Sequence, residues 1–269
     1  MVSKNTESLE KEFLSDINVK NSRDKIIELH NLQKDIEKES KPRDGIFFIL
    51  GHIEDEGYEN ENAHSDFLAW LFRPEQTHNL GSNFLEKFLF ETLDIDNINL
   101  DQAKITREYQ NRESKEKSAQ SIDILIELED RVICIENKRK SKESDTQLKD
   151  YVQIVKEVFT NKEHNYIFLT PDGKTPTHKS YKAISYYPVY KILKSIIDSE
   201  FIDNSEKERR QIYFEDYINF LRNTLKFNKA VVNEFKRFPS KYKQILDKQR
   251  WGFLYSHTEW EEFIKIMNE

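Results

Sequence analysis

The strongest constraint on the fold of this chain lies in two neighbouring segments, 121–128 and 132–138, which alternate with the period of a β-strand. The first reads Ser-Ile-Asp-Ile-Leu-Ile-Glu-Leu, and the second reads Val-Ile-Cys-Ile-Glu-Asn-Lys. With Glu129-Asp130 as a two-residue turn between them, the two segments form an antiparallel hairpin. The sequence therefore predicts an apolar hairpin within a sheet.

This register places three charged side chains on one face of the hairpin. Asp123 lies opposite Glu136, and directly opposed residues have Cβ atoms about 5 Å apart. Lys138, two residues beyond Glu136, projects from the same face. Two carboxylates this close repel each other, and a divalent cation is the usual remedy, while the lysine orients water or stabilises charge on a phosphate. The alternative is a surface hairpin whose polar face is merely solvated.

Only six Gly and six Pro interrupt the chain, so long helices are expected around the strands. Helical spacing of apolar residues occurs at 8–40, 46–53, 60–73, 83–93, 144–159, 213–225 and 231–249. Strand-like segments occur at 104–109, 121–128, 132–138 and 166–170. This order predicts an α/β fold. We expect a single domain over 1–269, with a helical N-terminal extension at 1–53, a core at 54–190 and a helical C-terminal extension at 191–269.

The composition favours a soluble, reduced protein of the cytoplasm. Its 18 Phe, 12 Tyr and 3 Trp supply core material that a disordered chain would lack. No window approaches the ~18 unbroken apolar residues of a membrane span, and the first residues lack a secretory signal. The single cysteine, Cys134, excludes an internal disulfide. The net charge of −7 argues against passive coating of nucleic acid, but not against an enzyme with a local basic patch and a metal.

A stripe on the helix expected at 60–73 brings one more acid toward the core. Glu61, Ser65, Leu68 and Phe72 recur at helical spacing, so Glu61 faces the same way as the apolar residues that must pack inward. A glutamate facing the core needs a partner, and a metal site would provide one. The alternative is that Glu61 only caps the start of the helix, where the helix dipole favours acids.

Two further features follow the hairpin. Gln147 and Tyr151 lie one turn apart on the next helix, so their side chains share a face. A basic run directly after Lys138 either contacts a nucleic-acid backbone or is simply solvated, and it consists of Arg139, Lys140 and Lys142.

Taken in order, Asp123, Glu136-Asn137-Lys138 and Gln147-x-x-x-Tyr151 resemble the motifs of the PD-(D/E)XK nuclease superfamily, including the Q-x-x-x-Y element of its RecB-like members. The upstream run from Glu61 to Pro74 is similar to an uncharacterised bacterial subfamily in which such a helix precedes the nuclease core. The resemblance covers about residues 55–190. One departure is that no proline precedes Asp123.

The resemblance implies a restriction-endonuclease-like core with a mixed sheet flanked by helices, and hydrolysis of phosphodiester bonds that depends on Mg²⁺ or Mn²⁺. It implies metal ligands at Asp123, Glu136, the Ile135 carbonyl and Glu61. It implies a catalytic lysine at Lys138 and a supporting catalytic pair at Gln147 and Tyr151. Expected nucleic-acid contacts are Ser65, Arg139, Lys140 and Lys142.

Two functions of different classes are compatible with these residues. The first is a metal-dependent nuclease acting on DNA, with RNA as the second option, in defence against phage or in DNA repair. The second is a catalytically silent protein that keeps the fold and binds nucleic acid or protein. The complete set of Glu61, Asp123, Glu136 and Lys138 favours the enzyme, because a silent relative is expected to have lost a ligand. No membrane partner is expected, and the oligomeric state is left open, with a homodimer as one option.

Overall fold

The computed structural model describes residues 16–38, 61–110, 121–138, 146–199, 207–225 and 230. The chain divides into two compact units, one combining Met1–Ser40 with Lys226–Glu269 and the other spanning Lys41–Leu225. Helix α2 (Ile17–Lys38) belongs to the first unit and is the described part of the helix expected at 8–40. The helices expected at 46–53 and 231–249 lie outside the described residues, and the single-domain organisation stays a prediction.

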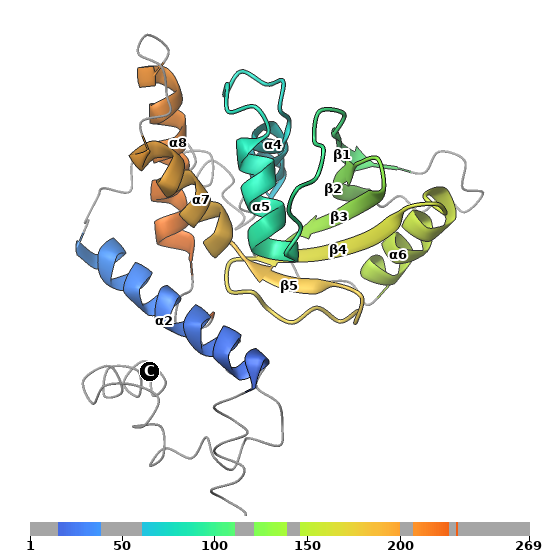
Figure 1. Ribbon diagram of the computed structural model, residues 1–269, viewed down its shortest axis with the longest axis horizontal. Coiled ribbons are helices and arrows are strands. Elements are labelled where there is room, and N and C mark those ends of the chain that lie inside the picture. The colour runs from blue at the N-terminus through green and yellow to red at the C-terminus, as the bar shows by residue number, and fades with distance from the viewer. Residues whose placement is uncertain are drawn as a thin grey trace, which may run out of the picture. The chain divides into compact units, whose positions relative to one another are not determined.

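The second unit is built on a five-stranded mixed sheet (Figure 1). Its strands, in both chain order and spatial order, are β1 (Lys104–Tyr109), β2 (Ile122–Glu127), β3 (Arg131–Asn137), β4 (Glu163–Thr170) and β5 (Lys182–Ser185). The pairs β1–β2 and β2–β3 are antiparallel, whereas β3–β4 and β4–β5 are parallel. Helix α6 (Gln147–Val158) connects β3 to β4, because parallel neighbours need a crossover. The predicted α/β fold with a mixed sheet is confirmed.

The central hairpin has the register that its alternation predicts. Ile124 pairs with Ile135, and the Leu128 N–H donates to the Arg131 carbonyl across the expected turn (2.9 Å). A slip of one residue would move every side chain of a strand to the opposite face. The register therefore decides which side chains of β2 and β3 can meet.

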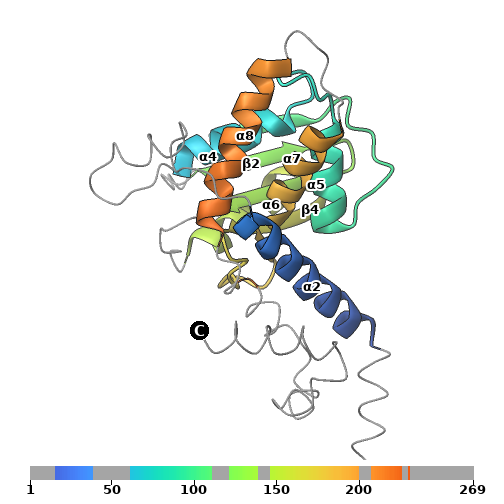
Figure 2. The ribbon, with the colours of Figure 1, turned by 90° about the vertical axis from the view of Figure 1, so that its left-hand side faces the viewer.

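Helices cover both faces of the sheet (Figures 1 and 2). Helix α6 packs on β3 and β4, whereas α4 (Glu61–Phe72) contacts β1 and β2. Helices α5 (Asn83–Leu93), α7 (Tyr187–Asp198) and α8 (Lys207–Thr224) extend the layer that contains α4. No helix in the described residues is long and apolar enough to span a membrane.

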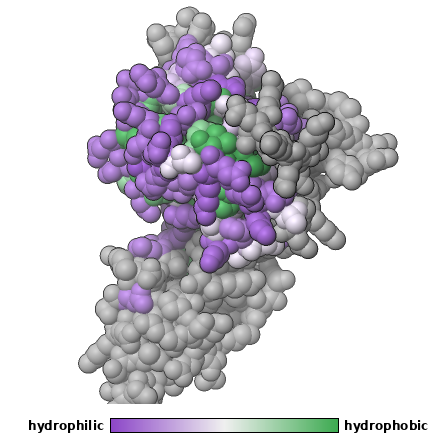
Figure 3. All heavy atoms as spheres, turned by 90° about the vertical axis from the view of Figure 1, so that its right-hand side faces the viewer, coloured by the Kyte–Doolittle hydropathy of each residue, from purple (hydrophilic) through white to green (hydrophobic). Residues whose placement is uncertain are grey.

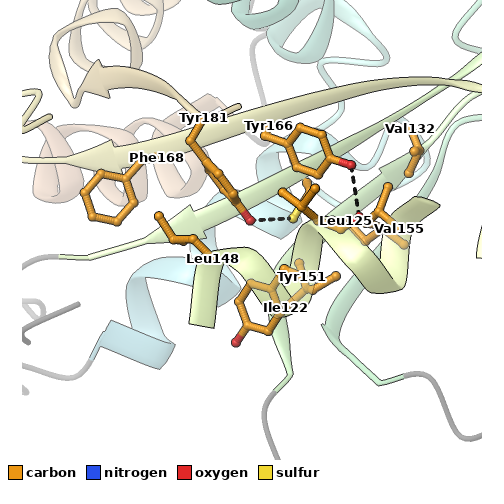
Figure 4. Close-up of a cluster of buried hydrophobic side chains, with 11 residues drawn as sticks. Ile122, Leu125, Val132, Leu148, Tyr151, Val155, Tyr166, Phe168 and Tyr181 are labelled. Atoms are coloured by element: carbon orange, nitrogen blue, oxygen red, sulfur yellow. Dashed lines mark hydrogen bonds between the residues drawn. The ribbon is translucent and has the colours of Figure 1, made fainter. Parts of the chain in front are cut away.

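The core beneath α6 is rich in tyrosine (Figure 4). Tyr151, Tyr166 and Tyr181 are all buried there. The Tyr181 hydroxyl lies 3.4 Å from Cys134 Sγ, and the Tyr166 hydroxyl donates to the Val152 carbonyl (3.5 Å). Rings of this size bury a large apolar area, and bonded hydroxyls avoid the cost of unpaired polar groups. Burial raises the pKa of the Cys134 thiol, so it stays protonated and unreactive in the core.

Within the described residues, the Asp, Glu, Lys and Arg residues that are buried are Glu136 and Arg210, so most of the charge lies outside this core. The face in Figure 3 is mostly hydrophilic, with a small apolar area among polar side chains. Within the described residues, the large hydrophobic side chains that are exposed are Phe90, Val158, Ile212 and Tyr213.

Several elements differ from the sequence prediction, among them β4, which begins at Glu163 instead of 166, and α7, which was expected only as part of a helical extension. Strand β5 was not expected, since its four residues are too few to show a period. Helix α8 begins at Lys207 instead of 213, because its first turn, Lys-Glu-Arg-Arg, carries no apolar residue that would mark it.

Candidate active site

The centre of the site is a carboxylate pair on β2 and β3. Extending the register that joins Ile124 to Ile135 by one residue places Asp123 opposite Glu136. Glu136 lies two residues beyond Cys134, a member of the core beneath α6, so both side chains point to the α6 face. The side chain of Glu136 is 0% exposed. The hairpin thus holds two acids together on the buried face of its open end.

Lys138 provides the positive charge beside this pair. Its Nζ lies 2.9 Å from Glu136 Oε1 and 3.9 Å from Glu61 Oε2. Its backbone N–H donates to the Leu169 carbonyl (2.9 Å), so β4 fixes the main chain where β3 ends. The lysine is therefore anchored at its backbone and at its ammonium group.

Glu61 reaches the site from the first residue of α4. It is an acid of the first helical turn, as the capping alternative requires, and its side chain is 23% exposed. Its ion pair with Lys138 also places it at the edge of the carboxylate pair. The structure thus brings together the four charged residues that the sequence singled out, namely Glu61, Asp123, Glu136 and Lys138.

The electrostatics of the cluster follow from burial. Burial, followed by repulsion from Asp123, raises the pKa of Glu136 to about 8. Burial also raises the pKa of Asp123, although the Asn137 N–H and the Lys138 charge act against this shift. Burial works to lower the pKa of Lys138, but the surrounding carboxylates outweigh it and the net shift is upward. When its carboxylates are ionised, the site therefore carries more negative charge than the single positive charge of Lys138 can neutralise.

The donor set fits a hard divalent cation. Among the described residues, no hydrogen-bond partner reaches the buried Glu136 Oε2. A buried carboxylate oxygen without a partner is costly, and a cation with oxygen ligands would satisfy it. No group of three or more His, Cys, Asp or Glu side chains in the described ranges is already spaced to hold a metal. In this arrangement the Lys138 ammonium lies between Glu61 and Glu136.

The Gln147–Tyr151 pair lies under the same end of the hairpin. Gln147 Nε2 donates to the Tyr151 hydroxyl (2.9 Å), as their spacing of one turn predicts. The hydroxyl in turn donates to the Ser121 carbonyl just before β2 (2.6 Å). This chain of bonds ties the start of α6 to the strand that carries Asp123.

Replacing Tyr151 with phenylalanine is expected to lower the free energy of unfolding by about 1–2 kcal/mol, because the part-buried Ser121 carbonyl loses its donor. Urea unfolding measures this loss. The matched control is Tyr166→Phe, which removes only a 3.5 Å contact and should cost less. A Tyr151→Phe protein as stable as the wild type would contradict the structural role of the pair.

Other predicted site residues are placed differently. Ser65 is 1% exposed, and its hydroxyl accepts a hydrogen bond from Asn137 Nδ2 (2.9 Å). That burial does not fit the expected contact with nucleic acid. Ile135 is fully buried in β3 directly before Glu136. The expected backbone contacts Arg139, Lys140 and Lys142 lie outside the described residues.

Three residues at the site were missed by the sequence reasoning. Asn137 is fully buried and points to the α4 face, opposite to Glu136. Its Oδ1 accepts a hydrogen bond from the Tyr186 hydroxyl, and Arg107 Nη1 donates to the Asp123 carbonyl. The sequence could have pointed to Asn137, because it is an amide on the strand face that a helix covers. A polar side chain in such a place needs hydrogen-bond partners.

The fold and the site together define a class of protein. A mixed sheet flanked by helices, with two acids and a lysine at the open end of its central hairpin, is the architecture of a restriction-endonuclease-like domain. A family model described as the PD-(D/E)XK nuclease superfamily matches residues 44–255. The chain belongs to the PD-(D/E)XK nuclease superfamily, as its motifs predicted. The subfamily and the Q-x-x-x-Y assignment stay predictions.

Further comparisons add no closer relationship. No curated protein matches this chain, and no solved structure matches it.

Proposed function

We propose that this protein is a nuclease that hydrolyses phosphodiester bonds in DNA with the help of Mg²⁺ or Mn²⁺. The superfamily suggests nuclease activity in general. The observation that carries the proposal is the convergence of Glu61 and Glu136 on Lys138, with Asp123 facing Glu136. A role in phage defence or DNA repair accords with the common uses of the superfamily.

The roles of the residues follow from their chemistry. Asp123, Glu136, the Ile135 carbonyl and Glu61 are the oxygen donors that would hold the cation. When bound, a divalent cation supplies a Lewis acid for the phosphate and lowers the pKa of a bound water. These donors lie on two strands and a helix, so their placement depends on the packing of all three elements.

Lys138 acts on the charge that develops during hydrolysis. The oxygen of water attacks phosphorus, the bond from phosphorus to the leaving oxygen breaks, and negative charge builds on the phosphate. An ammonium held in place by Glu136 and by its own backbone can stabilise that charge without reorganising. Its elevated pKa keeps it protonated throughout the neutral range.

The direct test is incubation of the purified protein with supercoiled, linear and single-stranded DNA, and with RNA, in Mg²⁺, Mn²⁺ or EDTA. The proposal expects cleavage of DNA that stops in EDTA and is reduced about 10²–10³-fold in Lys138→Ala protein prepared in the same way. Cleavage of RNA alone would change the substrate. Binding of DNA without cleavage under any metal would favour the alternative, a catalytically silent nuclease-fold binding protein.

Millimolar Mn²⁺ or Mg²⁺ is expected to raise the Tm of the metal-free protein, because a ligand of the native state stabilises it. The gain is about 2.7 kcal/mol at a metal concentration 100 times the Kd. Calorimetry measures the shift. Asp123→Asn should lose most of it by removing a ligand charge, whereas Lys138→Ala should keep it. A wild-type Tm that does not respond to either ion would count against the metal site.

A further inference from the structure

Helix α4 is joined to the sheet by two consecutive polar residues, Ser65 and Asp66. Ser65 Oγ accepts a hydrogen bond from Asn137 Nδ2 on β3 (2.9 Å). Asp66 Oδ1 accepts one from Arg107 Nε on β1 (2.7 Å). We call these two pairs the α4 clamp. They lie one turn after Glu61, so they hold the end of the helix that carries it.

Both sheet residues of the clamp also hold Asp123. The backbone N–H of Asn137 donates to Asp123 Oδ2 (2.8 Å), and Arg107 Nη1 donates to the Asp123 carbonyl. The Tyr186 hydroxyl donates to Asn137 Oδ1, so both ends of the buried amide are bonded. Each clamp residue thus links the helix that bears Glu61 to the strand that bears Asp123.

The backbone of β1 is distorted at the same place. Glu108, directly after Arg107, has a φ of 49°, a left-handed conformation that is uncommon for glutamate. The β1–β2 ladder pairs Arg107 with Ile124 and Tyr109 with Ile122, with Glu108 between them unpaired. Such conformations persist where the surrounding structure holds them, and they cluster at functional sites.

Apolar packing also attaches α4 to the core. Leu68, Ala69 and Phe72 are fully buried and attach the helix to the core through apolar packing. Apolar packing is non-directional, whereas the buried Ser65–Asn137 hydrogen bond is satisfied in one register only. The Asp66–Arg107 pair lies at the exposed edge of the same contact, with 65% of the Asp66 side chain exposed. The clamp therefore fixes the position of α4 on the sheet, whereas apolar packing supplies most of the attachment.

We propose that Asn137 and Arg107 are positioning residues, which use Ser65 and Asp66 to set Glu61 against the site formed by Asp123, Glu136 and Lys138. This inference rests on the proposed nuclease function. It also explains the middle residue of the Glu136-Asn137-Lys138 motif, because the two flanking side chains face the reaction while that of Asn137 secures the helix on the opposite face of the sheet.

The test is a double-mutant cycle. Ser65→Ala and Asp66→Ala are made in the wild type and in Glu61→Ala protein, and single-turnover DNA cleavage is measured at saturating Mn²⁺. Each change is expected to lower the cleavage rate by about 10–100-fold, since a small displacement of a reacting group has effects of this size. In the Glu61→Ala background the same changes should have less than about a twofold effect, because sites that act through one another are not additive. The Kd for DNA should not change.

Matched controls distinguish a displacement of Glu61 from a general loss of protein stability. Thr92→Val removes another fully buried hydroxyl, and Asp198→Ala removes another exposed helical carboxylate in an ion pair, both outside the site. Neither should alter cleavage. Asp66→Asn keeps an oxygen acceptor for Arg107 and should restore most of the rate lost in Asp66→Ala.

A second measurement, amide hydrogen exchange over residues 61–72, does not depend on cleavage. Exchange there should accelerate in Ser65→Ala and Asp66→Ala but not in the controls. Equal losses of rate with and without Glu61, or unchanged exchange, would overturn the clamp. If the wild type never cleaves, the proposed nuclease function fails. Faster exchange would then still support the clamp, and unchanged exchange would overturn it.

Discussion

Lys138→Ala is expected to reduce DNA cleavage by about 10²–10³-fold while leaving the fold and metal binding largely intact. Removing one preorganised electrostatic contact to a transition state typically has an effect of this size, or about 3–4 kcal/mol. The ammonium lies 2.9 Å from Glu136, and the Lys138 side chain is only 15% exposed, so water cannot replace the ammonium effectively. Single-turnover cleavage rates at several Mn²⁺ concentrations measure the effect, and extra metal should not rescue the variant.

The chain offers a close control for this substitution. Lys162 is another partly buried lysine, and its Nζ lies 3.0 Å from Glu127 Oε1. Lys162→Ala removes a comparable ion pair between a lysine and a strand glutamate outside the site, and it should leave cleavage unchanged. If Lys138→Ala cleaves as fast as Lys162→Ala, the reaction is catalysed elsewhere in the protein or by a contaminant.

Glu136→Gln is expected to abolish cleavage and, in the absence of metal, to make the protein more stable. The substitution removes a charge from a side chain that is 0% exposed and whose Oε2 has no hydrogen-bond partner in the described residues. A buried polar group without a partner costs about 1–3 kcal/mol, and removing its charge should raise the free energy of unfolding by an amount of this size. Cleavage is lost because a neutral amide is a poor ligand for a hard cation.

The stability gain should depend on pH with a definite sign. The folded-state pKa of Glu136, about 8, lies above the ordinary value of 4.5, so the folded protein binds more protons between these values. The free energy of unfolding of the metal-free wild type therefore falls as pH rises through this range, by the contribution of Glu136. The variant lacks this contribution. Its advantage should be small at pH 5 and largest at pH 9.

Urea unfolding in EDTA at pH 5, 7 and 9 tests this expectation. Mn²⁺ should reverse the order at pH 9, because it stabilises only the protein that can bind it. Glu127→Gln, a strand glutamate with 31% of its side chain exposed, is the control and should show no gain. If Glu136→Gln protein is less stable than wild type at pH 9 without metal, the ionised Glu136 beside Asp123 does not destabilise the metal-free protein, and the expectation is wrong.

Much of the fold could be predicted because its elements carry local patterns. The alternation along β2 and β3 and the turn at Glu129-Asp130 together predicted the register that brings Asp123 and Glu136 face to face. Apolar spacing predicted α5 and, within one residue at each end, α4. Strand β5 and the first turn of α8 were missed, because four residues show no clear period and Lys-Glu-Arg-Arg contains no apolar stripe.

The site was predictable only where its geometry is local. Glu136 and Lys138 are two residues apart at the end of β3, and Gln147 and Tyr151 are one helical turn apart, so these contacts follow from backbone periods alone. Ser65 was expected to contact nucleic acid on the resemblance to the superfamily. The structure instead buries it against Asn137, because the stripe faces the sheet and its polar member needs a partner there.

By itself, the sequence determined the hairpin, its register and the identity of the acids and the lysine, since each depends on neighbours within a few residues. Tertiary structure alone decided what surrounds them. Asn137 meets Ser65 across 72 positions and Tyr186 across 49, and Arg107 meets Asp66 across 41. No local period encodes contacts at such separations. They form only when helices and strands pack, because the buried Asn137 amide and the part-buried Arg107 guanidinium then bond to the polar groups that the fold places beside them.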